Sequence, residues 1–323
     1  MLRACMNMIC QMAKTNPNVV LICCDQGPGV EVEGVVPGRY FMEAISEANI
    51  TGMATGLAAE GYIPYILNHA TFNTRKSYEQ IALDACLQNR PIRLIGMGGG
   101  LATAHLGPTH TAIEDVAIMR AIPNMTVIVP CDADEVTRLM PHTLDWPGSI
   151  YIRMAKYGKP IVSKSEAGFE IGKAILMREG DVLIVTNGAM THRALTAAQQ
   201  LSEKGIECGV LHVHTVKPLD KAIIEHIRKS RMVVMIEEHT LIGGLGSACM
   251  ELLVDNQALA NIPPIYRMGL PDAFVQDYGD QDSLLEVYGL QPNQIAGKIL
   301  TLIKENALAG AYREADKTDI EIP

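Results

Sequence analysis

The amino-acid sequence predicts an α/β protein built from two doubly wound domains, each with a mainly parallel sheet. Short apolar segments such as 19–24 run continuously instead of alternating with polar residues, which is typical of strands buried on both faces. Segments with helical periodicity separate these strands, as expected for a parallel sheet with helices on its faces. The length of 323 residues is sufficient for two such domains.

The first domain is predicted to span residues 1–157. Its expected helices cover residues 2–15, 76–88, 112–120 and 132–144, with another beginning near Glu47, and its expected strands cover 19–24, 62–67, 92–96, 126–129 and 149–152. In open parallel sheets, ligands bind at the carboxyl ends of the strands. We therefore expect the chemistry in the loops that follow residues 24, 67, 97 and 152.

A second, smaller α/β domain is predicted over residues 179–305. Its expected strands cover residues 181–186, 207–213, 232–236 and 265–268, with helices between them. Residues 158–178 are interpreted as a crossing linker. Residues 306–323 are charged and lack a clear apolar period, so we expect a loose tail there.

The composition excludes several classes of function. The net charge is −9, and no basic patch interrupts it, so nucleic acid is a poor candidate partner. No apolar run reaches the length of a membrane span. The eight cysteines include no CxxC pair and lie mostly in apolar segments, which favours buried, reduced thiols in a cytoplasmic protein over metal or redox roles.

Glu47 stands just before a run of small residues at helical spacing, from Gly52 to Gly61. Small residues let another backbone approach closely, and Gly61 supplies a helix stop. A carboxylate entering such a close-packed helix is costly to bury unless it has a partner. A surface or capping glutamate is the alternative.

The glycine-rich loop 96–110 is the most unusual segment of the chain. Its glycines permit positive φ angles and a close approach of backbone to ligand, and a Gly-Pro turn precedes Thr109 and His110. His110 is therefore a candidate catalytic residue, although many loop histidines only make structural hydrogen bonds. The Gly243–Gly246 segment lacks dinucleotide-loop spacing and is better explained by close packing.

Three arginines, Arg3, Arg75 and Arg153, are the basic residues nearest the predicted strand ends. Each taken singly is interpretable as a surface residue. Arg153 differs because it follows an apolar strand, and a guanidinium matches phosphate oxygens bidentately. Asp25 closes another strand, where a turn or capping role is the alternative to binding.

Several of these blocks, in this order, resemble the transketolase family of thiamine-diphosphate enzymes, specifically its C-terminal half. The matching blocks are Gly38-Arg39-Tyr40, Ile45 to Gly52, Thr71-Phe72, Tyr78-Glu-Gln80, Gly107-Pro-Thr-His110, Glu114-Asp115, Arg120 to Asn124, Pro130 to Glu135, Glu237 to Thr240 and Gly243 to Gly246. The likeness extends to about residue 305. It implies that residues 1–157 form a pyrimidine-binding domain and 179–305 a transketolase C-terminal domain.

The resemblance assigns cofactor-binding roles to four residues. It implies that Glu47 bonds the aminopyrimidine ring nitrogen of thiamine diphosphate and thereby promotes removal of the thiazolium proton. Phe72 would stack on the aminopyrimidine ring, and Asp25 would line its pocket. Arg75 occupies a position at which transketolase proper tends to have an aromatic residue. An arginine at this position is similar to the pattern of deoxyxylulose-phosphate synthase.

The resemblance also suggests substrate-binding residues. His110 would hydrogen-bond the donor's oxygen, and Arg3 and Arg153 would hold a substrate phosphate. Leu106 departs from the family pattern, because sugar-using transketolases usually carry an aspartate there to bond a donor hydroxyl. An unmet buried hydroxyl costs about 1–3 kcal/mol, so a donor lacking it, such as pyruvate or an unusual keto compound, is a hypothesis.

The chain has no GDG…N motif, which in the family holds the diphosphate and Mg²⁺. We therefore expect an N-terminal partner subunit to supply both functions, in an α2β2 assembly, and expect this chain alone to be inactive. Two alternatives remain open: the beta subunit of a 2-oxoacid dehydrogenase, and a non-catalytic scaffold paralogue. Donor, acceptor and pathway are not disclosed by the sequence.

Overall fold

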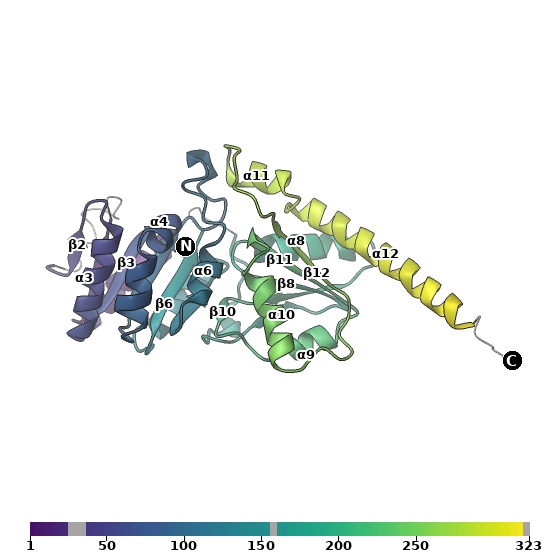
Figure 1. Cartoon of the computed structure of the whole chain (residues 1–323), viewed down its shortest axis with the longest axis horizontal. Coiled ribbons are helices and arrows are strands. Elements are labelled where there is room, and N and C mark those ends of the chain that lie inside the picture. Colours follow the sequence, from purple (N-terminus) through teal and green to yellow (C-terminus); the bar gives the residue numbers. More distant parts are fainter. Residues whose placement is uncertain (25–36, 156–159, 319–323) are drawn as a thin grey trace.

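The computed structural model describes residues 1–24, 37–155 and 160–318, with side chains described as far as residue 307. Two α/β domains lie side by side, and a long C-terminal helix extends away from the second (Figure 1). Each domain has a mainly parallel sheet with helices packed on it, which confirms the predicted fold class.

The first domain holds a seven-stranded sheet in the order β10-β5-β6-β4-β3-β1-β2. Its strands are β1 (Val19–Cys23), β2 (Tyr40–Met42), β3 (Ile63–His69), β4 (Arg93–Met97), β5 (Met125–Ile128), β6 (Ser149–Met154) and β10 (Thr215–Lys217). The neighbouring strands run parallel except β10, which pairs antiparallel with β5. Because β10 comes from beyond residue 179, the second predicted domain contributes a strand to the sheet of the first.

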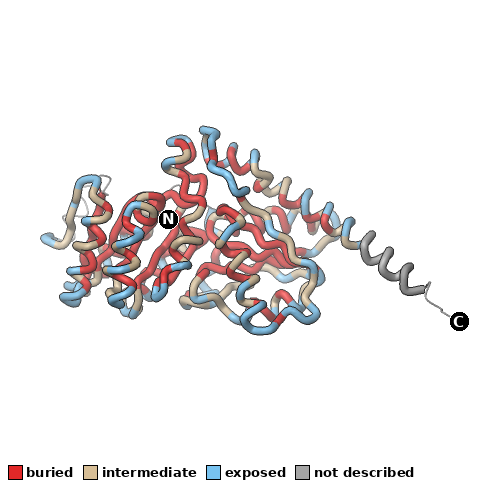
Figure 2. Tube along the Cα trace, viewed as in Figure 1, coloured by how far each residue is buried: buried red, intermediate tan, exposed pale blue. Residues whose placement is uncertain are grey.

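Helices cover both faces of this sheet. They are α1 (Leu2–Thr15), α3 (Glu47–Ala59), α4 (Ala70–Arg75), α5 (Tyr78–Gln80) with the π-helical turn η1 (Ile81–Cys86), the 3₁₀ turn η2 (Ala104–Leu106), α6 (Asp115–Ala121) and α7 (Ala133–His142). One apolar cluster joins α1 and α7 to the sheet, and a second joins α3, η1 and α6 to its other face. Buried strands therefore lie between partly exposed helices (Figure 2).

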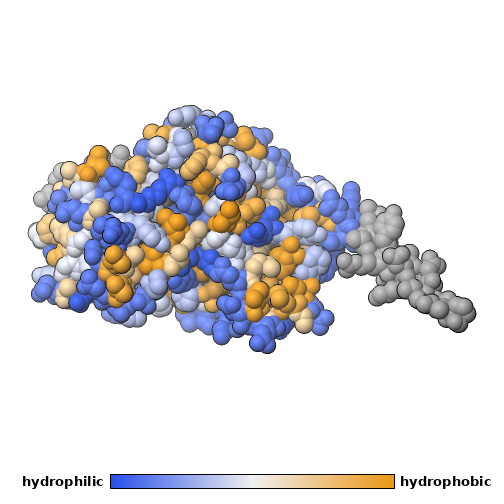
Figure 3. All heavy atoms as spheres, in the orientation of Figure 1, coloured by the Kyte–Doolittle hydropathy of each residue, from blue (hydrophilic) through white to orange (hydrophobic). Residues whose placement is uncertain are grey.

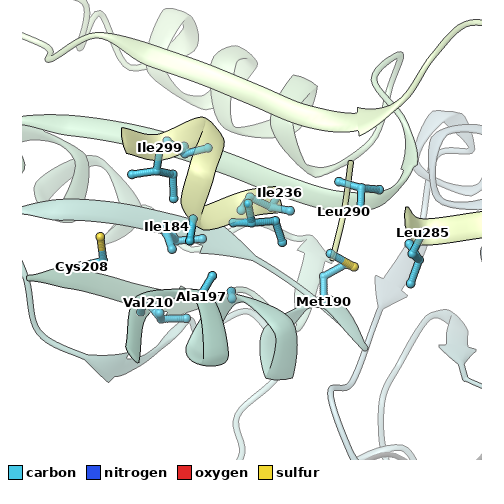
Figure 4. Packing of buried hydrophobic residues seen from close by; sticks show 14 of the residues in the cluster. Ile184, Met190, Ala197, Cys208, Val210, Ile236, Leu285, Leu290 and Ile299 are labelled. Carbon is cyan, nitrogen blue, oxygen red and sulfur yellow. The ribbon is translucent and has the colours of Figure 1, made fainter. Parts of the chain in front are cut away.

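The second domain holds a five-stranded sheet in the order β12-β11-β8-β9-β7. Its elements are η3 (Ser165–Ala167), β7 (Ile175–Arg178), β8 (Val182–Thr186), α8 (Met190–Ser202), β9 (Cys208–His212), α9 (Ile223–Arg228), β11 (Met232–Thr240), α10 (Leu245–Asp255), β12 (Ile265–Leu270), α11 (Gln281–Val287) and α12 (Pro292–Thr318). Strand β7 is antiparallel to β9, and the other pairs are parallel. Figure 4 shows Ile184, Ala197 and Ile299 meeting in the core between this sheet and its helices.

Two boundaries differ from the expectation. Strand β7 lies inside the predicted linker, because Ile175–Arg178 pairs along the edge of β9. Helix α12 continues to Thr318, through residues predicted as a loose tail. That stretch contains four alanines, and alanine has the highest helix propensity, which favours helix even without an apolar stripe.

Cysteine positions agree with the expected reduced thiols. The described residues contain no disulfide, and every cysteine is buried except the half-buried Cys10. Burial raises the pKa of Cys5, and likewise that of Cys23, to about 12. None of the helices in the described part of the chain combines the length and apolar character that crossing a membrane requires.

Candidate active site

Glu47 is the first residue of α3, and only 6% of its surface is exposed. Its Oε2 accepts a hydrogen bond from the Lys76 ammonium at 2.6 Å. The Lys76 side chain is 47% exposed, so the buried carboxylate is paired with a cation that is partly in contact with solvent. The structure thus places Glu47 in a buried position with one cationic partner, which a surface glutamate would not need.

Phe72 and His110 lie together beside this pair. Phe72 is carried by α4, immediately after the carboxyl end of β3, and its ring centroid is 5.0 Å from that of His110. Lys76 Nζ lies 5.4 Å from the centroid of the same Phe72 ring. Because Lys76 also contacts Glu47, it connects the carboxylate to the aromatic pair. Residues from three separate segments therefore converge at one end of the sheet, as the motif positions predicted.

The His110 side chain contacts polar and aromatic neighbours. Thr109 Oγ1 lies 2.9 Å from His110 Nδ1, and the His69 ring lies 5.8 Å from the His110 ring. The segment before it is fixed to the second domain: Leu101 N–H donates to the buried Glu238 carboxylate, and a side chain at Gly100 would collide with that carboxylate. The glycine-rich loop is therefore held by the C-terminal domain.

Arg75 lies next to the aromatic pair, but its guanidinium is already bound. It forms a two-pronged ion pair with Glu114, and its Nη2 also donates to the Thr111 carbonyl at 3.0 Å. The hydrogen bond from Arg75 to Glu114 raises the pKa of the arginine. Arg75 remains a predicted cofactor-binding residue, and its position is set by α6 and the loop rather than by a ligand.

A pocket of about 560 Å³ opens beside the Arg75–Glu114 pair. Both domains line it, with Arg75, Ile113, Glu114, Thr240, Pro271, Asp272, Ala273 and Phe274. Phe274 is 73% exposed, and the charged lining residues are one arginine and two carboxylates. On the face drawn in Figure 3, apolar residues form several separate patches over both domains. The pocket therefore offers apolar walls and no excess of positive charge.

Arg153 is buried at the end of β6 and bound inside the protein. Its Nε donates to Asp115 Oδ2 at 2.9 Å, and its Nη2 donates to the carbonyls of Ala112 and Glu238. Burial opposes the charge, yet Asp115 and Glu238 raise the pKa of Arg153 above its usual value. Phosphate binding by Arg153 remains a prediction, and its internal contacts favour a structural role.

The other predicted site residues have different surroundings. Leu106 is exposed in η2, next to Gly107, which packs under the Tyr278 ring. Arg3 is exposed in the first turn of α1 and forms no ion pair with a described residue. Asp25 lies outside the described residues. The roles predicted for these three residues remain predictions.

A buried polar cluster joins the two domains away from these residues. His212 Nε2 lies 3.0 Å from Glu135 Oε2, and Thr191 Oγ1 lies 2.8 Å from His212 Nδ1. Burial opposes ionisation of Glu135, but His212 lowers its pKa to about 2. The Cys131 thiol is near enough to complete a metal-ligand set, yet burial raises the pKa of Cys131 far above its usual value. The Glu135–His212 pair accounts for this cluster without a metal.

The Gly243–Gly246 segment packs closely, as the sequence predicted. Glu237 accepts hydrogen bonds from the N–H groups of Leu245 and Gly246 at the start of α10. A side chain at Gly244 would collide with Glu237. The N–H groups at the start of α10 therefore already bind a carboxylate of this chain, the position that a phosphate would take in a dinucleotide loop.

The sequence interpretation missed Lys76, Glu114 and Asp115 as partners of the site residues. Lys76 follows Phe72 by four positions at the end of α4, the spacing that places two helical side chains on one face. Glu114 and Asp115 are adjacent acidic residues at the start of α6, one for each of two arginines. The spacing from Phe72 was a usable signal, whereas the two long-range arginine pairs had none.

The comparisons with known proteins identify the class of protein. The family profile "Transketolase, pyrimidine binding domain" matches residues 1–157, and "Transketolase, C-terminal domain" matches residues 172–295. The chain therefore belongs to the transketolase family.

Individual relatives narrow this to a C-terminal subunit. A putative uncharacterized transketolase family protein of Sinorhizobium fredii is 39% identical over 83% of this chain and 78% of the relative. The 6-deoxy-6-sulfo-D-fructose transketolase subunit SqwH of a Clostridium species is 38% identical over 80% of each chain. A solved structure, described as a split gene transketolase in an inactive beta4 tetramer, is 32% identical, has a TM-score of 0.81 and is covered over 96% of its length. This chain is a transketolase-like C-terminal subunit.

Proposed function

We propose that this chain is the C-terminal subunit of a two-chain, thiamine-diphosphate-dependent transferase. In this proposal the enzyme moves a two-carbon ketol or acyl unit from a keto donor to an aldehyde acceptor. The chain acts only with an N-terminal partner subunit, which holds the diphosphate and Mg²⁺. The observation that carries the proposal is the buried Glu47 carboxylate beside the Phe72 and His110 rings.

The side chains of Glu47 and Phe72 fit the pyrimidine end of the cofactor. Glu47 has an oxygen that accepts a hydrogen bond from a cationic donor, and the Phe72 ring already has a cation near its face. A flat heterocycle with a ring nitrogen that shares a proton requires these two surfaces, a carboxylate oxygen and an aromatic face. Glu47 provides the carboxylate oxygen and Phe72 provides the aromatic face.

When bound, thiamine diphosphate supplies the nucleophilic carbon that carries the two-carbon unit between substrates. Glu47 would share a proton with the aminopyrimidine ring nitrogen, from a position that is largely closed to water. Phe72 would stack on the ring and fix its orientation. His110 would donate a hydrogen bond to the donor's carbonyl oxygen, with Thr109 Oγ1 orienting the imidazole.

The need for a partner subunit has support from the sequence and from the relatives. The chain has no GDG…N segment for the diphosphate and Mg²⁺. Relatives that this chain covers almost fully include one chain of an apulose-4-phosphate transketolase from Phocaeicola vulgatus, whose name describes it as a subunit. By contrast, the chain spans about half the length of 1-deoxy-D-xylulose-5-phosphate synthases, with 47% of the one from Trichodesmium erythraeum covered. An α2β2 assembly is the simplest arrangement that completes both active sites.

The substrate is proposed to enter through the pocket beside Arg75 and Glu114. The names of SqwH and the apulose-4-phosphate enzyme describe ketose substrates, which supports transfer of a ketol unit. Leu106 argues for a donor without the hydroxyl that an aspartate would bond at this position. Transfer assays of the complex with pyruvate and with a ketose phosphate as donor distinguish these two donor classes.

Co-expression with an N-terminal transketolase subunit that carries the GDG…N motif, sought first in the neighbouring reading frame, tests the proposal. We expect the complex, and not this chain alone, to catalyse transfer that depends on thiamine diphosphate and Mg²⁺. Glu47→Gln should lower kcat by roughly 10²–10⁴-fold, the usual contribution of general acid–base catalysis, with little change in the unfolding midpoint. The proposal fails if the purified single chain turns over robustly, or if Glu47→Gln loses stability and retains its turnover.

A further inference from the structure

Lys76 contacts both surfaces that the cofactor's pyrimidine would need. Its ammonium lies 2.6 Å from Glu47 Oε2 and 5.4 Å from the centroid of the Phe72 ring. A nitrogen donor therefore already satisfies the buried carboxylate and lies near the aromatic face. The two contacts come from one flexible side chain at the C-terminal end of α4.

We propose that Lys76 is a built-in substitute for the cofactor, which holds Glu47 in the unloaded subunit and is displaced when thiamine diphosphate binds. This inference rests on the proposed function. It assigns Lys76 a positioning role toward Glu47 and makes it a determinant of cofactor affinity. Lys76 takes no part in the chemistry of the two substrates.

Displacement is physically accessible for Lys76. Its side chain is 47% exposed, so an outward rotation places the ammonium in water, and the hydration that it gains compensates for much of the lost ion pair. The contact with Glu47 is its only ion pair among the described residues. Lysine also has a flexible four-carbon stem and a compact charge, which suits it to switching between two partners.

The neighbouring Arg75, unlike Lys76, is held by several contacts. Its guanidinium makes two bonds to Glu114 and one to the Thr111 carbonyl, and the Arg75 side chain is 30% exposed. Releasing Arg75 would break several contacts and leave Glu114 without its partner. Releasing Lys76 breaks one contact, and the incoming ring nitrogen replaces that contact at Glu47.

Lys76 also compensates the buried charge of Glu47 in the subunit without cofactor. A carboxylate buried without a partner is costly, and the Glu47 side chain is 5% exposed. The ion pair lets the chain fold with its catalytic carboxylate in place before the partner and cofactor arrive. Its consequence is competition, because part of the cofactor's binding free energy is used to remove Lys76 from Glu47.

The test uses Lys76→Met, which keeps the apolar stem and removes the charge. Lys204→Met, at an exposed position in the second domain, is the matched control. Binding of thiamine diphosphate with Mg²⁺ to the two-chain complex is measured by titration calorimetry. We expect Lys76→Met to bind about tenfold more tightly than wild type, the effect of removing one charge-assisted hydrogen bond at a partly exposed site, and Lys204→Met to match wild type.

A second measurement uses the single chain and needs no cofactor. Denaturant unfolding of wild type, Lys76→Met, Glu47→Gln and the double variant forms a thermodynamic cycle. We expect Lys76→Met to destabilise the wild-type chain more than it destabilises the Glu47→Gln chain. Equal effects would show that the two side chains are not coupled, which overturns the inference.

The two proposals fail in different ways. If the wild-type complex binds thiamine diphosphate but Lys76→Met binds it equally or more weakly, displacement of Lys76 is refuted and the proposed function stands. If neither the wild-type complex nor any variant binds it, the proposed function itself is refuted, and the inference falls with it.

Discussion

Replacing Arg153 with methionine distinguishes a structural arginine from a phosphate ligand. The guanidinium-bearing side chain is 7% exposed, and the Asp115 side chain with which it pairs is 1% exposed. Its removal leaves Asp115 with a hydrogen bond from the Tyr151 hydroxyl at 2.5 Å, and Asp115 Oδ1 is already without a partner among the described residues. The buried charge would then be almost uncompensated.

The expected cost follows from this geometry. Removing one partner of a buried ion pair destabilises a protein by about 3–5 kcal/mol. The carbonyls of Ala112 and Glu238 also lose their shared donor, at about 1 kcal/mol each. Since losses around one group are not additive, we expect Arg153→Met to lower the free energy of unfolding by roughly 4 kcal/mol.

Denaturant unfolding of the single chain measures this loss, and acceptor kinetics of the complex provide the contrast. The double variant Arg153→Met/Asp115→Asn should recover part of the stability, because it removes both charges of the pair. Under a structural role, KM for a phosphorylated acceptor rises no more than KM for its unphosphorylated analogue. Near wild-type stability combined with a KM increase confined to phosphorylated acceptors would refute this reasoning and support the phosphate role.

Three further predictions concern pH and specificity. Burial lowers the pKa of His214 to about 4 from its usual 6.5, so the unfolded chain binds that proton first, and stability present above pH 6.5 is lost as the pH falls toward 4. The loss of stability is roughly 3 kcal/mol, at about 1.36 kcal/mol per pKa unit. Unfolding free energies of wild type and His214→Gln, measured from pH 7.5 to 4, should diverge by this amount. Parallel pH profiles of the two proteins would contradict the prediction. Leu106→Asp should raise kcat/KM for ketose donors relative to pyruvate by roughly tenfold, since it restores a hydroxyl partner; an unchanged ratio in competition assays would count against a role for Leu106. Phe274→Ala should raise the acceptor KM several-fold with kcat retained, whereas Val287→Ala, at the exposed last residue of α11, should not; an acceptor KM for Phe274→Ala equal to that of wild type would exclude the pocket beside Arg75 as the substrate entrance.

The fold was predictable from the sequence because its strands are continuous apolar runs with local signals at both ends. The expected strand 149–152 appears as Ser149–Met154, and the expected helix 2–15 appears as Leu2–Thr15. The convergence of Glu47, Phe72 and His110 was predictable for a related reason. The carboxyl ends of parallel strands share one edge of a sheet, so motifs that follow those strands meet there.

What the sequence did not reveal depends on long-range pairing. Strand β10 has three residues, and nothing local indicates that Thr215 pairs across the domain boundary with Ile128 of β5. Arg153 likewise has the local signature of a ligand-binding arginine, a basic residue at the end of an apolar strand. Its actual partner, Asp115, is 38 positions away and is brought to it only by folding.

Three of the cations considered for the candidate site, Arg153, Arg75 and Lys76, differ in how firmly they are bound. Arg153 is enclosed by Asp115 and two carbonyls, and Arg75 is held by Glu114 and one carbonyl, whereas Lys76 has a single ion-pair contact and is the most exposed of the three. The two arginines therefore stabilise the ends of strands and helices independently of any ligand. Under the proposed function, these buried and half-buried charges are already paired within the single chain before a partner subunit or a cofactor binds, and Glu47 is the group whose ion pair is most easily broken. This arrangement suits the subunit that we propose, because a rigidly paired Glu47 could not bind the cofactor's pyrimidine, and an unpaired buried Glu47 would destabilise the chain before the partner subunit binds.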